Sequence, residues 1–329
     1  MKEDIVDFVI IWVDGNDEEW QKEKAKYSPD KNTDYRNIRY RDWDNLQYWF
    51  RGVEKFAPWV NKIHFVTCGH LPKWLNVNHP KLNIVKHSDF IPEKYLPTFS
   101  SHTIELNLHR IDGLADKFVF FNDDMFIVNY IKKEHFFENG KPCDIAVFVP
   151  EMVEDETFSS ILNNNMFLLN KNFKKNDVLK KNFFKFFTLR NGTDNLKTLL
   201  CIPWHKMLGF KETHHANAFL KETYEKVWNK EFKKLDETCK NRFRSPLDVN
   251  QYIFKYWQFC EGNFYPQKNI KKFYRIFDDL DGACNAIKTQ KFKLICLNDS
   301  DKNGDFEDAK KAIIDSFEKI LPDKSSFEI

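Results

Sequence analysis

The chain has 329 residues, of which 42% are hydrophobic and 30% charged. That length is enough for one large α/β domain or two smaller ones, and the apolar content excludes a disordered chain. Lys and Arg number 51 against 49 Asp and Glu, which gives a net charge of +2. A balance this close to neutral does not favour nucleic acid as a partner.

The beginning of the chain and its cysteines predict a cytosolic protein. Charged residues interrupt the first apolar run, so we expect no signal peptide, and no stretch approaches the length of a membrane span. The seven cysteines are widely spaced and form no C-x-x-C pair. We therefore expect reduced thiols with mainly structural roles.

The first predicted strand, Ile5 to Val13, ends in an acidic turn made of Asp14, Gly15, Asn16 and Asp17. Glycine lets the backbone approach a ligand closely, and the neighbouring carboxylates could contact a base, a ribose or a metal ion. An ordinary turn is the alternative. The following segment, Glu19 to Arg41, is polar and basic without a sustained apolar period, which predicts a loop whose cations either neutralise phosphates or are simply solvated.

Alternating helices and strands follow. Leu46 to Phe56 has the apolar spacing of a helix, with Asp44 as its expected cap. Predicted strands at Lys62 to Thr67 and Leu82 to Val85 flank a short helix at Trp74 and Leu75. Such alternation is typical of a largely parallel, wound α/β sheet.

Thr98 to Leu114 predicts a further helix, which begins at a Ser cap and carries His102 and Glu105. It leads into Phe118 to Phe121, a continuous apolar run typical of a strand buried on both faces. Asn122, Asp123 and Asp124 follow that strand directly.

The Asn-Asp-Asp corner is the principal candidate site. In open α/β sheets, ligands bind beyond the carboxyl ends of the strands. Two carboxylates there suit Mg²⁺ or Mn²⁺ carrying a phosphorylated substrate. A plain turn is the alternative, because Asn and Asp are common turn residues.

We expect three parts: an α/β core over residues 1–150, which ends with a strand at Asp144 to Val149; a mainly helical lobe over 151–264; and a C-terminal part over 265–329 that completes the core. The lobe contains His214 and His215, which cannot both face the same way on a regular element, so one of them should be a bystander. It also contains Arg244 and Asp248.

The C-terminal part predicts a strand at Lys291 to Leu297, an acidic loop, and a helix from Phe306 to Leu321. Asp299 and the residues up to Asp305 match the first positions of an EF-hand loop, but Lys310 stands where a bidentate Glu is needed. We expect either an irregular divalent-ion site or a capped turn.

Taken together, these segments resemble the Stealth family, which includes bacterial capsular-polysaccharide phosphotransferases and the lysosomal-enzyme GlcNAc-1-phosphotransferase. The resemblance lies in four ordered blocks: DFVIIWVDGNDEEW; the long block from Arg39 to Phe137 with LPTFSSHTIELNLHRIDGL and FVFFNDDMFI; His214 to Ala218 with Phe243, Arg244, Ser245 and Asp248; and FKLICLND. Relatives often have His-x-Pro in the third block, where Ala216 takes the proline position.

The resemblance implies a Rossmann-like or glycosyltransferase-A-like sheet. It also implies the transfer of a hexose-1-phosphate from a UDP-sugar, by default UDP-GlcNAc, to a hydroxyl of a capsular or cell-surface polysaccharide. UMP is the expected leaving group. The resemblance further implies Mg²⁺ or Mn²⁺. A capsule enzyme is expected in the cytoplasm, with peripheral association with the assembly machinery at the inner face of the membrane.

Roles are assigned on the same basis. Asp123, Asp124 and Asp299 are the expected metal ligands, and Asp123 also positions the donor. The expected nucleotide-sugar contacts are Asp14, Gly15, Asp17, His102, Glu105 and Asn122. His214 is the expected general base, and Arg244, oriented by Asp248, the expected phosphate clamp, since its guanidinium fork fits phosphate oxygens.

Two other functions fit the same residues. A metal-dependent glycosyltransferase would use the same donor but release UDP. A non-catalytic carbohydrate-binding protein would bind tightly without turnover, and it would leave His214 and Arg244 without a task.

Overall fold

The computed structural model describes residues 5–27, 41–152, 156–299 and 304–329. Its central sheet has five strands in the order β3-β2-β1-β4-β8. The first four are parallel, and β8 is antiparallel to β4. Their bounds are β1 (Asp7–Ile11), β2 (Ile63–Thr67), β3 (Leu82–Lys86), β4 (Lys117–Phe121) and β8 (Asn217–Leu220). The predicted wound α/β sheet is confirmed.

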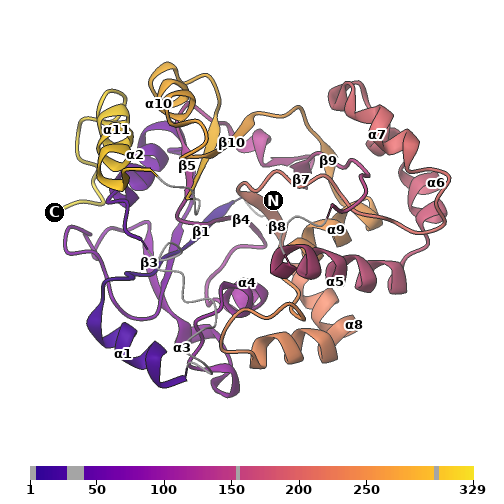
Figure 1. The fold of residues 1–329 in the computed structure, drawn as a ribbon, viewed down its shortest axis with the longest axis horizontal. Coiled ribbons are helices and arrows are strands. Elements are labelled where there is room, and N and C mark those ends of the chain that lie inside the picture. The colour runs from indigo at the N-terminus through magenta and orange to yellow at the C-terminus, as the bar shows by residue number, and fades with distance from the viewer. Residues whose placement is uncertain (1–4, 28–40, 153–155, 300–303) are drawn as a thin grey trace.

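Helices cover both faces of this sheet, as the continuous apolar strands require. Alternate residues along β1 face opposite sides: Phe8 and Ile10 belong to one core cluster and Val9 to the other. The first cluster lies under α2 (Leu46–Phe56), α10 (Leu280–Thr289) and α11 (Phe306–Glu318); the second lies under α4 (Ser101–Asn107), α5 (Glu156–Asn172), α8 (Lys221–Lys240) and α9 (Tyr252–Glu261) (Figure 1).

Two small sheets flank the main one. In the first, β11 (Leu294–Asn298) lies between β10 (Lys271–Arg275), which is parallel to it, and β5 (Met125–Ile127), which is antiparallel. The second contains β6 (Phe137–Glu138), β7 (Lys141–Asp144) and β9 (Tyr265–Pro266). Because β5 directly follows the Asn-Asp-Asp corner, the C-terminal chain returns to that corner through β11.

The segment between residues 151 and 264 contains α5, α6 (Lys175–Phe186), α7 (Asp194–Leu200), α8 and α9. It also supplies β8, which joins the main sheet beside β4. The division into three parts stays a prediction, and β8 is a direct structural link between the first two of them.

Several local predictions were wrong. Part of the expected loop after Asp17 is the helix α1 (Glu18–Tyr27), which Trp20 anchors by its burial; the rest of that loop, 28–40, lies outside the described residues. Of the expected strand at Asp144 to Val149, only Asp144 belongs to a strand, as the last residue of β7, and Phe148 forms an isolated bridge with Phe210. Trp74 and Leu75 form no helix, because Leu75 bridges to Glu328 instead.

Helix ends also differ. Asn45, rather than Asp44, is the N-terminal cap residue of α2, since Asp44 has a φ of 47°. The helix expected over Thr98 to Leu114 ends at Asn107, before a 3₁₀ turn at Leu108–Arg110. The remaining short elements are α3 (His87–Phe90) and 3₁₀ turns at Glu93–Tyr95, Lys133–His135 and Leu189–Asn191.

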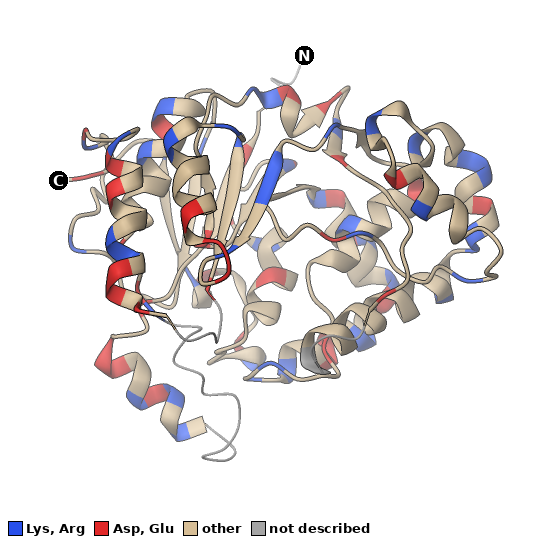
Figure 2. Ribbon diagram, turned by 45° about the horizontal axis from the view of Figure 1, so that its top comes forward, with Lys and Arg blue, Asp and Glu red and all other residues tan. Residues whose placement is uncertain are grey.

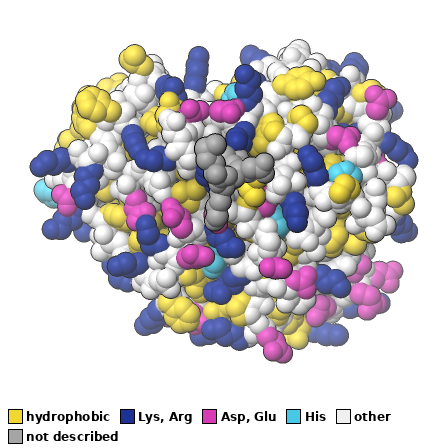
Figure 3. Space-filling view, turned by 180° about the vertical axis from the view of Figure 1, so that it is seen from behind, with side chains coloured by type: hydrophobic (Ala, Val, Ile, Leu, Met, Phe, Trp, Pro, Cys, Tyr) yellow, Lys and Arg dark blue, Asp and Glu magenta, His cyan; other side chains and the backbone are white. Residues whose placement is uncertain are grey.

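Charged residues lie mainly on the helices and connecting loops, while most of the central strand ribbon is uncharged (Figure 2). On the face drawn in Figure 3, basic and acidic side chains are interspersed among the described residues. Among those residues, no helix combines the length and apolarity needed to cross a bilayer.

The buried carboxylate of Asp7, in the first strand, ties together the chain at the amino ends of the strands. Its Oδ1 accepts hydrogen bonds from Asn61 Nδ2 at 2.7 Å and from the backbone N of Lys62 at 3.1 Å. Its Oδ2 lies 3.1 Å from His64 Nε2 and accepts from Ala115 N at 2.8 Å. Burial alone would raise the pKa of Asp7, but these bonds outweigh it and lower that pKa.

We predict that Asp7→Ala lowers the free energy of unfolding by about 3–5 kcal/mol, because it leaves buried donors without their acceptor. Urea unfolding measures this, with the exposed Asp112→Ala expected to stay within about 0.5 kcal/mol of the parent chain. The pKa of Asp7 in the folded state lies below the ordinary 3.8. The difference in free energy of unfolding between the parent chain and Asp7→Ala is therefore complete above pH 3.8. It is lost as the pH falls through the folded-state pKa. An equal stability of both variants would contradict this role.

Candidate active site

Strand directions bring four distant segments to one edge of the sheet. Because β1 and β4 are parallel and paired as Ile10 with Phe121, the turns that follow them are neighbours. Strand β8 runs the other way, so the residues just before it, including His214, arrive at the same edge. Leu297 N donates to Asp124 O at 2.8 Å, which extends the β11 pairing into the Asn-Asp-Asp corner.

Asp124 is at the centre of this gathering. Its Oδ2 lies 3.5 Å from His214 Nε2 and accepts from Cys296 Sγ at 3.2 Å and from Asn298 Nδ2 at 3.4 Å. Its Oδ1 is buried and has no hydrogen-bond partner among the described residues. Burial raises the pKa of Asp124, but the bond with His214 and the other donors lower it overall. The group is therefore a carboxylate with one free buried oxygen.

His214 is held in a strained position beside Asp124. Its φ of 42° lies in the left-handed region, which is uncommon for a residue other than glycine. Glu212 Oε1 accepts from the backbone N of His214 at 3.2 Å, and the buried Lys255 holds Glu212 through an ion pair of 3.1 Å. The ring is oriented by Tyr252, whose Oη lies 3.1 Å from Nδ1. Burial lowers the pKa of His214, while Asp124 raises it and prevails.

His215 occupies a different environment. It is buried, and its Nδ1 has no partner among the described residues. Burial, together with Lys271 and His214, lowers the pKa of His215 to about 2. It therefore remains neutral in the core, whereas His214 faces the acidic corner.

The other two acids of the predicted metal set have different surroundings. Asp123 is exposed beyond the end of β4, and the surrounding protein, together with the charge of Asp124, raises its pKa. Asp299 lies past β11, where its Oδ2 is 3.2 Å from Arg41 Nε. Of the acidic loop after Asp299, residues 300–303 lie outside the described residues, so its EF-hand resemblance is not placed.

The first acidic turn is organised by local hydrogen bonds. Asp14 N donates to His70 Nε2 at 2.7 Å, and Asp14 Oδ1 accepts from Asn16 N at 2.9 Å. Asp17 Oδ1 accepts from Trp20 N at 2.7 Å, which is the geometry of a helix cap. Gly15 is buried, and its carbonyl accepts from Gln21. Asp14 and Gly15 thus lie at the carboxyl edge of the sheet, beside the end of β4. Asp17 also caps helix α1.

Helix α4 and the loop carrying Arg244 form the remaining side. His102 Nδ1 lies 2.9 Å from Oδ2 of the fully buried Asp248, which also accepts from Asn241 Nδ2 and Ser245 N. The exposed Arg244 donates instead to Ser101 Oγ at 2.8 Å. Asp248 therefore fixes the loop on α4 rather than contacting the guanidinium as we expected.

Glu105 completes this side of the site. It is buried on α4, and its Oε2 accepts from the backbone N of Gln251 at 3.3 Å. Its negative charge contributes to the raised pKa of His214, so the two groups interact electrostatically. Asn122 is half-buried, and its carbonyl accepts from Met125 N at 3.2 Å, which closes the corner.

One carboxylate oxygen of the site, Asp124 Oδ1, is available to a hard divalent cation. A buried carboxylate oxygen without a donor is costly unless a cation approaches it, and Asp124 Oδ1 is such an atom. Atoms of Asp124, His214 and Cys296 lie within 4.8 Å of one another. However, burial and Asp124 raise the pKa of Cys296 well above its usual value, so this thiol serves as a donor to Asp124 rather than as an anionic ligand.

Sequence reasoning missed several residues of the site: Cys296, Asn298, Tyr252, Arg41 and His70. Cys296 and Asn298 lie in the block FKLICLND, so their closeness to Asp124 could have been inferred if β11 had been paired with β5. Tyr252 carried no such signal, because it lies inside an aromatic helix.

Comparison with known proteins identifies two conserved regions. Residues 6–31 match Stealth protein CR1, conserved region 1, and residues 39–144 match Stealth protein CR2, conserved region 2. These matches contain both acidic corners of the main sheet and helix α4.

Full-length relatives are polysaccharide phosphotransferases. The chain is 43% identical to a capsular polysaccharide phosphotransferase WcwK of Streptococcus pneumoniae, with 98% of each chain covered. It is 40% identical to the receptor polysaccharide phosphotransferase WefC of Streptococcus gordonii, covering 98% of this chain and 99% of that one. It is 38% identical to the exopolysaccharide phosphotransferase cps2G of Lactiplantibacillus plantarum, covering 98% and 96%.

Among solved structures, mouse xyloside xylosyltransferase 1 shares 10% identity at a TM-score of 0.38, with 89% of this chain and 97% of that chain covered. Similarity at this level supports no conclusion about fold or function. The sequence matches identify the family, since they extend over nearly the whole chain at about 40% identity. The chain belongs to the Stealth family.

Proposed function

We propose that this protein transfers a hexose-1-phosphate from a UDP-sugar, by default UDP-GlcNAc, to a hydroxyl of a capsular or cell-surface polysaccharide and releases UMP. The names of its full-length relatives support phosphotransfer onto a polysaccharide. The observation that carries the mechanism is the Asp124–His214 pair, 3.5 Å apart at the carboxyl edge of the sheet.

In the proposed reaction the acceptor hydroxyl attacks the β-phosphorus of the donor. A new bond forms between the acceptor oxygen and this phosphorus, and the bond from phosphorus to the bridging oxygen breaks. UMP leaves with the bridging oxygen, and the hydroxyl proton passes to His214 Nε2. The product carries a phosphodiester, so each transfer adds one negative charge.

His214 suits the role of general base by its geometry. Tyr252 Oη lies 3.1 Å from Nδ1, so it fixes the ring with Nε2 directed to the corner where Asp124 lies. A positioned base of this kind contributes about 10²–10⁴ in rate. The ion pair of Glu212 with Lys255 maintains the backbone conformation that places the ring there.

In the proposed mechanism, Arg244 binds phosphate and the acidic residues bind the metal ion. Arg244 is exposed, and the hydrogen bond described for its guanidinium goes to the neutral hydroxyl of Ser101. The guanidinium can therefore reorient to bind two phosphate oxygens. Asp123 and Asp124 would hold Mg²⁺ or Mn²⁺, and Asp299 would be a further ligand. Such an ion, when bound, neutralises pyrophosphate charge.

A polysaccharide acceptor implies that the protein acts near the capsule assembly machinery. We propose a cytoplasmic protein that associates peripherally with that machinery at the inner face of the membrane.

We predict that His214→Gln lowers kcat by about 10²–10⁴, measured with UDP-GlcNAc, Mg²⁺ and an oligosaccharide acceptor. The matched control is His215→Gln, which changes the adjacent imidazole buried away from the corner and should keep activity within tenfold once thermal unfolding confirms its fold. The reverse pattern would assign the base to His215, and full activity of both would remove the histidines from the mechanism.

We predict that Asp124→Asn weakens Mg²⁺ binding at least tenfold, because a neutral amide replaces the carboxylate with the free buried oxygen. Titration calorimetry with Mg²⁺ alone measures this without turnover. Asp177→Asn, an exposed acid on α6, is the control and should bind Mg²⁺ like the parent chain. Unchanged affinity in Asp124→Asn would exclude Asp124 as a ligand.

A further inference from the structure

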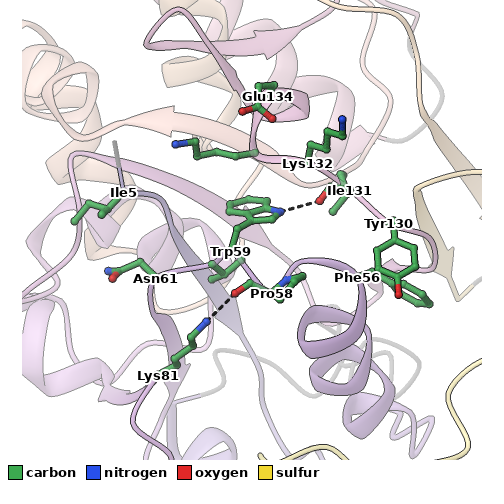
Figure 4. A pocket seen from close by; sticks show the side chains of 12 residues that line it. Ile5, Phe56, Pro58, Trp59, Asn61, Lys81, Tyr130, Ile131, Lys132 and Glu134 are labelled. Carbon is green, nitrogen blue, oxygen red and sulfur yellow. Dashed lines mark hydrogen bonds between the residues drawn. The ribbon is translucent and has the colours of Figure 1, made fainter. Parts of the chain in front are cut away.

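A concave site lies at the edge of the main sheet opposite the candidate active site. It is a cavity of about 710 Å³, lined by Ile5, Asn61 and Lys81 just before β1, β2 and β3, and by residues 130–134 after β5. Because the strands are parallel, their starts face away from the edge where His214 and Asp124 lie. The cavity, drawn in Figure 4, is therefore separate from the candidate active site, since none of its lining residues belongs to that site.

A fixed aromatic ring forms the middle of this cavity. Trp59 Nε1 donates to Ile131 O at 2.7 Å, and the indole packs edge-to-face on Phe8 with ring centroids 5.5 Å apart. These contacts hold the indole in one orientation while it stays partly exposed. Tyr130 adds a second ring that is 62% exposed and rests edge-on against Phe56.

The rim of the cavity is basic. Among the described residues that line it, Lys81, Lys132 and Lys133 stand against one acid, Glu134. Figure 4 shows Lys81 and Lys132 on opposite sides of Trp59. Lys81 Nζ is anchored on Pro58 O at 2.8 Å, which places one ammonium group beside the ring. An occupant that combines apolar faces with negative charge matches this arrangement.

We propose that this cavity binds a phosphodiester-linked saccharide, namely a segment of the growing polysaccharide remote from its reacting end. The identity of this occupant rests on the proposed function, since hexose-1-phosphate transfer produces a phosphodiester at each step. The C–H faces of sugar rings pack on Trp59 and Tyr130, and the lysines pair with the phosphodiester. The volume lies within the roughly 300–1,000 Å³ of typical small-ligand pockets.

The site has a kinetic consequence. A polymer held at a second place meets the active site at a raised effective concentration. Long acceptors should therefore benefit from the cavity, whereas a monosaccharide acceptor, which cannot reach both places, should not.

The test uses the double variant Tyr130→Ala, Lys132→Glu, which alters two exposed residues of the cavity. The matched control is Phe184→Ala, Lys181→Glu, an exposed aromatic and an exposed lysine on α6. The probe is a synthetic GlcNAc tetrasaccharide joined by phosphodiesters, compared by calorimetry with the same number of units joined by uncharged glycosidic bonds. Vesicles with phosphatidylglycerol serve as a second anionic probe.

We expect a Kd for the charged tetrasaccharide at least tenfold higher in the cavity variant than in the parent or the control, with weaker binding of the uncharged probe to the parent. The KM for a long acceptor should rise similarly, while turnover of a monosaccharide acceptor stays unchanged. Equal Kd values in all three proteins, or preference of the cavity for the vesicles, would overturn the proposal. Because the binding assay needs no donor, it gives its answer even if the proposed transfer reaction fails.

Discussion

The position of β4 between β1 and β8 determines the rest of this molecule. Its parallel pairing with β1 places two acidic turns side by side, and its antiparallel pairing with β8 brings His214 to the same edge. A shift of one residue in these pairings would exchange the side chains between the two faces of the sheet, so the site depends on the observed register. The candidate active site is thus a consequence of strand order.

An unpaired buried carboxylate oxygen and a strained backbone residue lie together at that edge. Asp124 keeps one buried oxygen without a described donor, and His214 has a left-handed backbone conformation. Such features persist only where the surroundings hold them. Here the surroundings are the Glu212–Lys255 ion pair, the Tyr252 hydroxyl and the β11 strand. By contrast, the buried Asp7 at the opposite edge has both oxygens bonded, as expected of a structural acid.

Local sequence pattern predicted the parts of the fold that depend on local chemistry. Apolar runs identified β1, β2, β3 and β4, and helical spacing identified α2. The pattern failed where tertiary contacts decide the outcome: α1 is held by one buried aromatic, Trp20, and β8 is only four residues long, so neither has a clear period.

The same distinction holds for the site. The acidic corners could be predicted, because polar residues directly follow apolar strands. The partners of Asp248 could not, since His102 lies 146 residues away in the sequence. The same is true of Cys296, whose contact with Asp124 requires the pairing of β11 with β5.

The central claim concerns which atom of the donor is attacked, and the nucleotide released reports this directly. Purified protein would be incubated with Mg²⁺, a panel of UDP-hexoses and a short phospho-oligosaccharide acceptor, and the products separated by chromatography. The account predicts UMP together with an acceptor that has gained a hexose-1-phosphate. Release of UDP would instead show attack at the anomeric carbon and contradict the proposed phosphotransfer.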